Sequence, residues 1–252
     1  MRSKVLLVRV EGPLQSWGLR ARWDVRDSSQ EPTKSGVVGL IAAALGYSRD
    51  DPRIVGELEE GLEMGVRVEQ EGSPLEDYHT VTGFLPMAEG GFKYGGGGKK
   101  SLEKLERDPL ATATTIVSIR RYLMDASFLI ALGGRSAESP EILGRCASAL
   151  KNPVWPLFLG RRACVPSRPV FEALTDQYAG IEDALRRHPW SVLGAGAAPR
   201  FQNANAQLRM VVEHPEGAGR DDRRRASEGR LYGRRFVREE WIACPESGST
   251  TQ

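Results

Sequence analysis

Three histidines mark the places where this sequence could carry out acid–base chemistry near neutral pH. His188 and His214 each precede a proline, which favours a structural role at the end of an element. His79 follows Tyr78, and with a nearby lysine it could act as a general base in metal-free cleavage of RNA. A lone histidine is also a common structural hydrogen-bonding group, so both interpretations stay open.

Other catalytic signatures are missing from the sequence. It contains no Gly-x-Ser-x-Gly turn, no His-Glu-x-x-His motif and no tight carboxylate cluster for two metal ions. The glycine run at 95–98 is not a P-loop, because Lys93 stands in place of the first glycine and Lys100 in place of the serine or threonine. The three cysteines lack the spacing of a zinc site or a disulfide framework. The sequence therefore predicts no metal and no cofactor, and it leaves His79 as the one plausible general base.

Phosphate binding is the chemistry that the segment 32–46 favours. It begins Pro-Thr-Lys-Ser-Gly and continues as an alanine-rich apolar run to Gly46, which predicts a helix. The N-terminus of such a helix presents backbone N–H groups and a positive dipole end, here at Lys34, Ser35 and Gly36. Many helices begin this way and bind nothing, because Thr and Ser satisfy the N–H groups themselves.

Several short segments add cations and rings to this pattern. The turn at 12–18 supplies the amide of Gln15 and the indole of Trp17. The remaining candidates are arginines and tyrosines in short runs of neighbouring residues. They could bind phosphate or contact a base, and the alternative is that the arginines form surface ion pairs. They are Tyr78, Arg120, Arg121, Tyr122, Arg161 and Arg162.

Two longer stretches are rich in cations. Seven arginines lie between Arg220 and Arg235, and a second cluster around the glycine run includes Lys99 and Lys100. Clustered cations with nearby aromatics suit a phosphate backbone, whereas a solvated charged loop is the commoner fate of such runs. The net charge is only +2, so the positions of the cations matter more than their sum.

Composition limits the class of protein. The hydrophobic share of 40% and the charged share of 27% are ordinary for a globular protein, and no apolar run approaches the length of a membrane span. The scattered cysteines favour free thiols in a reducing cytoplasm. We therefore expect a cytoplasmic protein without a membrane partner.

The order of the predicted elements indicates an α+β fold. Strands are expected at 4–10, 64–68, 78–85, 115–122 and 126–132, and helices at 35–45, 52–61 and 139–151. Followed by an extended stretch at 153–159, this is the split βαβ order of a ferredoxin-like domain. We expect that domain at 1–164, with a thumb-like insertion at about 84–118, and a smaller β-rich region at 165–252.

Five ordered segments resemble one protein family. They are residues 12–18 (Gly-Pro-Leu-Gln-Ser-Trp-Gly), 32–40, 77–80, 121–128 and 159–164 (Leu-Gly-Arg-Arg-Ala-Cys). In this order they resemble the Cas5 family of the RAMP superfamily, in the CasD form found in subtype I-E CRISPR Cascade complexes. The match reaches about Pro169, and residues 234–241 resemble the family's arginine- and aromatic-rich C-terminal strand.

The resemblance implies a ferredoxin-like (RRM/RAMP) domain with an inserted thumb hairpin. It also implies a non-catalytic subunit that grips the 5′ handle of the CRISPR RNA (crRNA). Its other partners would be the backbone and large subunits, and target DNA through the complex. A metal-free endoribonuclease that processes CRISPR precursor RNA is the alternative, because related proteins of another subtype cut RNA. We expect RNA contacts at Gln15, Trp17, Lys34, Ser35, Gly36, Tyr78, His79, Lys99, Lys100, Arg120, Arg121, Tyr122, Arg161 and Arg162.

Overall fold

The structure is a computed structural model that describes residues 4–18, 25–83, 85–86, 90–93, 102–107, 114–136, 139–192, 207–225 and 232–245. The chain divides into two compact units. Unit 1 contains residues 1–19, 27–75 and 122–252, and unit 2 contains residues 20–26 and 76–121. Because each unit has its own set of contacts, we describe them one at a time.

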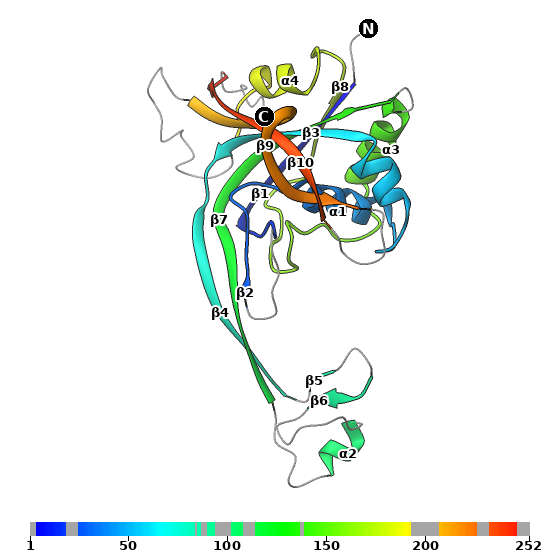
Figure 1. Cartoon of the computed structure of the whole chain (residues 1–252), viewed down its shortest axis with the longest axis vertical. Coiled ribbons are helices and arrows are strands. Elements are labelled where there is room, and N and C mark those ends of the chain that lie inside the picture. Colours follow the sequence, from blue (N-terminus) through cyan, green and yellow to red (C-terminus); the bar gives the residue numbers. More distant parts are fainter. Residues whose placement is uncertain are drawn as a thin grey trace. The chain divides into compact units, whose positions relative to one another are not determined.

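A twisted sheet forms the framework of unit 1 (Figure 1). Its strands follow the order β10-β9-β3-β7-β1-β8, and every pairing along this path is antiparallel. The strands are β1 (Val5–Gln15), β3 (Leu62–Gln70), β7 (Thr114–Gly134), β8 (Phe171–Thr175), β9 (Gln207–Arg224) and β10 (Tyr232–Ala243). The helices are α1 (Lys34–Leu45), the π-helix η1 (Ile54–Glu59), α3 (Ser139–Lys151) and α4 (Ile181–Arg187).

Helices cover both faces of this sheet, and this explains why β1 begins with four consecutive apolar residues, Val5 to Val8. Leu6, Val8 and Val10 join one core together with α1 and α3, whereas Val5 and Leu7 join a second core beneath α4. Successive side chains of a strand point to opposite faces, so a strand buried on both faces needs apolar residues at consecutive positions instead of at every second one. Figure 1 shows α1 and α4 on opposite sides of the sheet.

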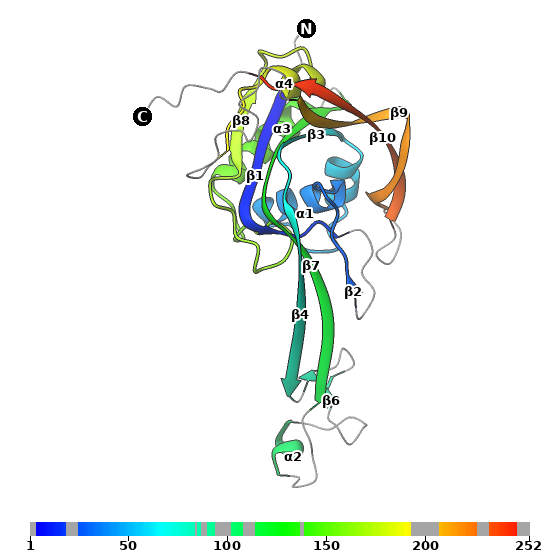
Figure 2. The ribbon, with the colours of Figure 1, turned by 90° about the vertical axis from the view of Figure 1, so that its left-hand side faces the viewer.

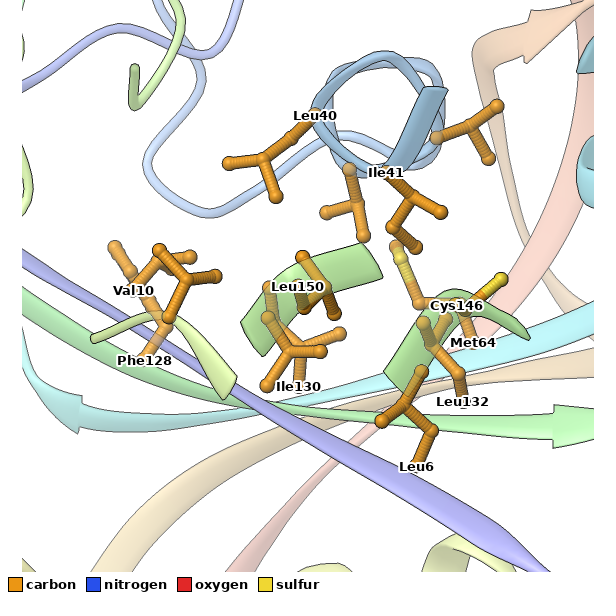
Figure 3. Packing of buried hydrophobic residues seen from close by; sticks show 14 of the residues in the cluster. Leu6, Val10, Leu40, Ile41, Met64, Phe128, Ile130, Leu132, Cys146 and Leu150 are labelled. Atoms are coloured by element: carbon orange, nitrogen blue, oxygen red, sulfur yellow. The ribbon is translucent and has the colours of Figure 1, made fainter. Parts of the chain in front are cut away.

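The larger core lies between the sheet and the helices α1 and α3. Leu40 and Ile41 of α1 point toward the sheet, where Phe128 and Ile130 of β7 lie, and Cys146 of α3 packs among them (Figure 3). Burial raises the pKa of the Cys146 thiol to about 12, so this thiol stays protonated and behaves as a small apolar side chain.

Helix α1 begins at Lys34, one residue before the predicted start, and ends at Leu45 as predicted. Thr33 is extended, and its Oγ1 accepts a hydrogen bond from the Gly36 N–H at 3.3 Å. Gly46 ends the helix with φ of +74°, a left-handed conformation that glycine adopts without steric cost. The helix position is therefore set by local residues, independently of any ligand.

Three elements differ from their sequence-based expectations. The strands expected at 115–122 and 126–132 are one strand, β7, which turns at Asp125 with φ of +55°. The stretch expected to be extended at 153–159 is irregular, and β8 at 171–175 takes the place beside β1. The helix expected at 52–61 is the shorter η1.

The region after residue 164 contributes β8, β9 and β10 to the same sheet as β1, β3 and β7. The division between the compact units instead crosses β4 (Ser73–Gly83) and β7 near residues 75 and 121. The expected insertion at about 84–118 falls within unit 2.

Unit 2 is built on a pair of strands, β4 and β7, with β2 (Val25–Arg26) pairing parallel to β7. No described residue of β4 is buried, and the Thr82 and Thr115 hydroxyls share a 2.9 Å hydrogen bond across the pair. Beyond them lie the short pair β5 (Leu85–Pro86) and β6 (Phe92–Lys93) and the helix α2 (Leu102–Glu106). Backbone pairing, rather than an apolar core, therefore accounts for the described part of this unit. No helix among the described residues is long and apolar enough to span a membrane.

Candidate nucleic-acid interface

The N-terminus of α1 already holds a carboxylate from its own chain. The Lys34 backbone N–H donates to Asp222 Oδ2 at 3.1 Å, although 188 residues separate the two. The Lys34 ammonium is buried, donating to the Leu62 carbonyl at 2.7 Å and pairing with Glu213 at 2.8 Å. Burial lowers the pKa of Lys34, while Glu213 opposes that shift. Direct contact with a phosphate would require Lys34 to leave these partners.

Ser35 and Gly36 lie half-buried at the same helix start. The Gly36 Cα faces the Trp17 ring so closely that an added Cβ would lie 2.9 Å from its Cε3 atom. This contact explains why glycine follows Ser35, because the indole fills the space of a side chain. The two predicted segments 12–18 and 32–40 are therefore packed together.

Gln15 and Trp17 are both buried and hydrogen-bonded to each other. The Trp17 indole N–H donates to Gln15 Oε1 at 3.0 Å, and Gln15 Nε2 donates to the Ala126 carbonyl at 2.6 Å. Trp17 is 1% exposed, so its ring supports α1 from beneath and presents no face to a base. The turn thus stabilises the framework of the predicted site.

The loop 159–164 lies against that turn. The Ser16 N–H donates to the Leu159 carbonyl at 2.9 Å, and the Leu159 N–H donates to the Cys164 carbonyl at 2.7 Å. Gly160 has φ of +100°, and a Cβ there would overlap the Ser16 carbonyl oxygen. The Gly160 backbone lies close to Ser16 and has a conformation that favours glycine. These two constraints fix the direction in which the chain continues to Arg161 and Arg162.

The two arginines of this loop have different surroundings. The guanidinium of Arg161 lies over the Tyr122 ring, with Cζ 4.6 Å from the ring centroid. Tyr122 is buried, so it supports Arg161 from behind, and Arg162 beside it is exposed. A planar cation stacked on a ring is held in one orientation, which suits it to phosphate or base recognition.

Four predicted residues lie in unit 2. Tyr78 is 69% exposed on β4, and His79 Nδ1 lies 3.4 Å from Asp77 Oδ2. Arg120 donates to Ser118 Oγ at 3.3 Å, and Arg121 forms an exposed ion pair with Glu76 at 3.1 Å. These four residues share the β4–β7 pair with one another. Lys99 and Lys100 lie outside the described residues.

Carboxylates of this chain neutralise most of the arginine-rich stretch between Arg220 and Arg235. The arginines of β9 and β10 pair with Glu31, Glu60, Asp50, Asp221 and Asp222, and the Arg235–Asp222 pair is a buried two-bond contact at 2.6 and 2.8 Å. Figure 2 shows the hairpin of these two strands, in orange and red, beside the blue helix α1. Its arginines thus attach the hairpin to unit 1, and we assign the cluster a structural role.

Comparison with known proteins identifies the family. A family model described as "CRISPR-associated protein (Cas_Cas5)" matches residues 5–238. The chain belongs to the Cas5 family. It is 33% identical over 179 residues to "CRISPR system Cascade subunit CasD" of Escherichia coli (strain K12), and the match covers 68% of this chain and 70% of that protein.

Two solved Cas structures resemble this Cas5 chain over 96% of its length. One, described as "Crystal structure of Cas protein", is 33% identical with a TM-score of 0.63 and is covered over 98% of its length. The other, a chain of a "CRISPR RNA-guided surveillance complex", is 29% identical with a TM-score of 0.67 and is covered over 91%. The sheet-dominated mixed fold of this Cas5 chain is therefore shared with known Cas proteins.

Sequence reasoning overlooked two residues of this region of the Cas5 chain. Trp155 is 57% exposed in the irregular stretch that precedes the 159–164 loop, and the prolines on either side of Val154-Trp155 are the sequence feature that could have marked it. Asp222 was hidden among arginines, and nothing local indicates that it reaches the start of α1. Trp155 and Tyr78 thus present exposed rings near predicted motifs, as do Phe236 and Trp241 of β10, whereas Trp17 and Tyr122 are buried.

Proposed function

We propose that this chain is a non-catalytic, cytoplasmic subunit of a CRISPR Cascade complex that holds the 5′ handle of the crRNA. In that role it contacts the neighbouring backbone subunit and the large subunit, and it meets target DNA through the complex. The observation that carries the proposal is the match over almost the whole chain to a chain of an RNA-guided surveillance complex. The 33% identity to a Cascade subunit supports the same assignment.

A ferredoxin-like core fits this role. The four strands β8-β1-β7-β3 lie side by side in antiparallel pairs, α1 connects β1 to β3, and α3 connects β7 to β8. That arrangement corresponds to the split βαβ pattern, whose sheet and connecting loops are used by RNA-recognition modules. The β4–β7 pair of unit 2 then corresponds to the thumb of the family.

The residues that we assign to RNA differ in their tasks. Arg161 and Arg162 bind handle phosphates, and Trp155 and Tyr78 offer exposed rings on which unstacked bases can lie. Gln15, Trp17, Lys34 and Gly36 hold the framework behind them. In this division, buried residues set the geometry and exposed residues touch the ligand.

Crosslinking inside the assembled complex tests the assignment. The chain is assembled with crRNA and the other subunits, and the handle carries a photoreactive nucleotide at each position in turn. We expect crosslinks to peptides that contain Trp155 or Arg162, and Arg162→Ala weakens them while complex yield is unchanged. Crosslinks confined to other subunits would contradict an RNA-holding role and favour a pure protein adaptor.

The endoribonuclease alternative rests on one contact, the His79–Asp77 pair at 3.4 Å. Such a pair could orient a general base, and a second acid–base group would be needed to protonate the leaving oxygen. Incubation of the purified chain with labelled repeat RNA in EDTA separates the two functions. We expect intact RNA, whereas cleavage that disappears in His79→Ala would establish the nuclease.

A further inference from the structure

A cavity of about 320 Å³ lies where β3, β7, β9 and β10 meet in unit 1. Two irregularities open it: the β3–β7 register shifts between Val68 and Gln70, and Asp125 of β7 adopts a positive φ. Gln70 Nε2 donates to the Asp125 carbonyl at 2.6 Å and thereby holds the turned backbone in place. Non-glycine residues with positive φ are uncommon and often mark a functional position.

Two tryptophans line this cavity, which we call the two-tryptophan pocket after Trp190 and Trp241. Trp190 is buried, and its indole N–H donates to the Glu69 carbonyl at 3.2 Å, so its ring cannot turn freely. Trp241 is 59% exposed on β10, although burial of its ring would stabilise the fold. A fixed ring and an exposed ring around one cavity form an aromatic site for a ligand.

Charge selects the kind of ligand. Glu71 and Asp125 are exposed carboxylates that line the two-tryptophan pocket. Glu69 lines it too, but its Oε1 pairs with the buried guanidinium groups of Arg9 and Arg67, so its charge is compensated within the chain. The cation of its lining is Arg209, which lies 2.7 Å from Glu31, 3.5 Å from Glu71 and 3.6 Å from Glu239. Arg220 shares Glu31 and Glu239, so these three carboxylates and Asp125 outnumber the two arginines around the pocket. An acidic surround repels phosphates and attracts cations, and aromatic faces stabilise a cation through their quadrupole.

We propose that the two-tryptophan pocket binds an arginine side chain presented by a neighbouring protein subunit. The flat guanidinium stacks on Trp241, its N–H groups donate to the carboxylates of Glu71 and Asp125, and its apolar stem covers Met124 and Trp190. The volume is at the lower limit of ligand pockets, which suits a side chain better than a nucleotide. That the partner is a subunit of the same complex rests on the proposed function, whereas guanidinium binding by the pocket does not.

Binding is tested on the full chain with N-acetyl-arginine amide as the probe, followed through the tryptophan indole NMR signals. We expect the signals of Trp190 and Trp241 to shift with a saturable dependence on the probe, while that of Trp155 stays in place. Asp125→Asn removes a charge and keeps a residue type that tolerates positive φ, and Glu71→Gln removes the second charge. The double variant should weaken binding at least tenfold, and N-acetyl-norleucine amide should not bind.

Three outcomes would overturn the proposal. Signals that do not move with the arginine probe show that the pocket takes no guanidinium. A larger response to adenosine monophosphate than to the arginine probe shows that the pocket is a base site of an RNA-binding surface. Normal recovery of the assembled complex with Trp241→Ala, against a control at the exposed Tyr232 of the same strand (Tyr232→Ala), shows that no subunit docks there. If handle crosslinking persists in all variants, the RNA-holding function stands and the pocket proposal alone fails.

Discussion

Two regions of unit 1 have the sequence of an anion-binding site, and the structure treats them differently. At the start of α1, Asp222 accepts the Lys34 N–H and Glu213 pairs with the Lys34 ammonium. In the 159–164 loop, the Arg161 guanidinium is stacked on a ring and Arg162 remains exposed. Whether a cation is available to a ligand therefore depends on which carboxylates the rest of the chain brings to it.

Burial explains why Lys34 is paired with carboxylates of its own chain while Arg162 stays exposed to solvent. A charged group removed from water costs several kcal/mol unless a partner of opposite charge and further hydrogen bonds accompany it. Lys34 lies beneath the β9–β10 hairpin, so its partners must come from the protein in every state of the complex. Arg162 stays hydrated and can exchange water for phosphate at little cost. The buried cation stabilises the fold, and the exposed one can serve a ligand.

The largest effect is expected for Asp222→Ala. This change removes both the carboxylate at the α1 N-terminus and the partner of the buried Arg235, and loss of one partner of a buried ion pair costs about 3–5 kcal/mol. Urea denaturation of the purified chain measures it as a fall in the free energy of unfolding. The matched control is Asp221→Ala on the same strand, whose ion pair with Arg234 is exposed and should contribute no more than about 1 kcal/mol. Equal losses in the two variants would contradict the claim that burial makes the Asp222 contacts more important to stability than the exposed Asp221–Arg234 pair.

Gly160→Ala is expected to damage the second region in a similar way. The new Cβ would overlap the Ser16 carbonyl oxygen at a positive φ, so the loop must move or the variant loses roughly 2–4 kcal/mol. Thermal unfolding followed by circular dichroism measures this loss. Gly144→Ala in α3 serves as control, because open space surrounds that glycine and alanine favours a helix by about 0.5–1 kcal/mol. A stable Gly160→Ala chain with normal RNA binding would show that the loop geometry is not needed.

The first region should also respond to pH through Glu59. Burial raises the pKa of Glu59 to about 7, although the Lys34 charge opposes this, and Asp222 and Arg223 act on it from β9. An ordinary Glu in the unfolded chain has a lower pKa, so the folded chain binds an additional proton between about pH 4.5 and 7. Stability should therefore rise as pH falls through 7, by on the order of 2–3 kcal/mol between pH 8 and pH 5. Glu59→Gln should remove this rise in denaturation curves measured from pH 8 to 5, and an unchanged profile would refute the assignment.

At lower pH, Glu172 acts in the opposite direction. Burial alone would raise the pKa of this carboxyl, but hydrogen bonds from His188 and Arg9 hold it at about 2. Its contribution to stability is present above the pKa of an unfolded Glu and is lost as pH falls toward 2. The Glu59 measurement is therefore restricted to the range above pH 5, where Glu172 stays ionised.

The smallest effect, and the most specific, is expected for Arg162→Ala. Loss of one phosphate contact should reduce handle-RNA affinity about tenfold or less and lower the slope of log K against log salt by about 1. The chain should unfold at the same urea concentration as the wild type, because Arg162 is exposed. Arg145→Ala, an exposed arginine of α3 paired with Glu57, controls for net charge and should leave the salt slope unchanged. An effect on stability without a change in slope would place Arg162 in the framework.

Local residues predicted much of this fold, and distant contacts explain what they did not predict. Thr33, Gly46 and the alanine-rich apolar run between them predict α1, and α3 matches its expected span from Ser139 to Lys151. The role of Lys34 depends on Asp222 and Glu213, more than 170 residues away, and no local pattern contains that information. Tyr122 and Arg161 were both predicted as RNA contacts, but their stacking on each other follows only from the folded backbone.

The long reach of the Asp222 and Glu213 contacts has a consequence for synthesis of the chain on the ribosome. Helix α1 leaves the ribosome early, but Glu213, which pairs with the Lys34 ammonium, and Asp222, which accepts the Lys34 backbone N–H, are translated more than 170 residues later. Until then β3 lacks its neighbour β9, and the start of α1 and Glu59 remain open to water. Prematurely terminated chains would keep an uncompensated cation and an unpaired strand edge, both of which invite proteolysis. A chain that ended before residue 213 would therefore lack both the Glu213 partner of the Lys34 ammonium and the Asp222 acceptor of the Lys34 backbone N–H.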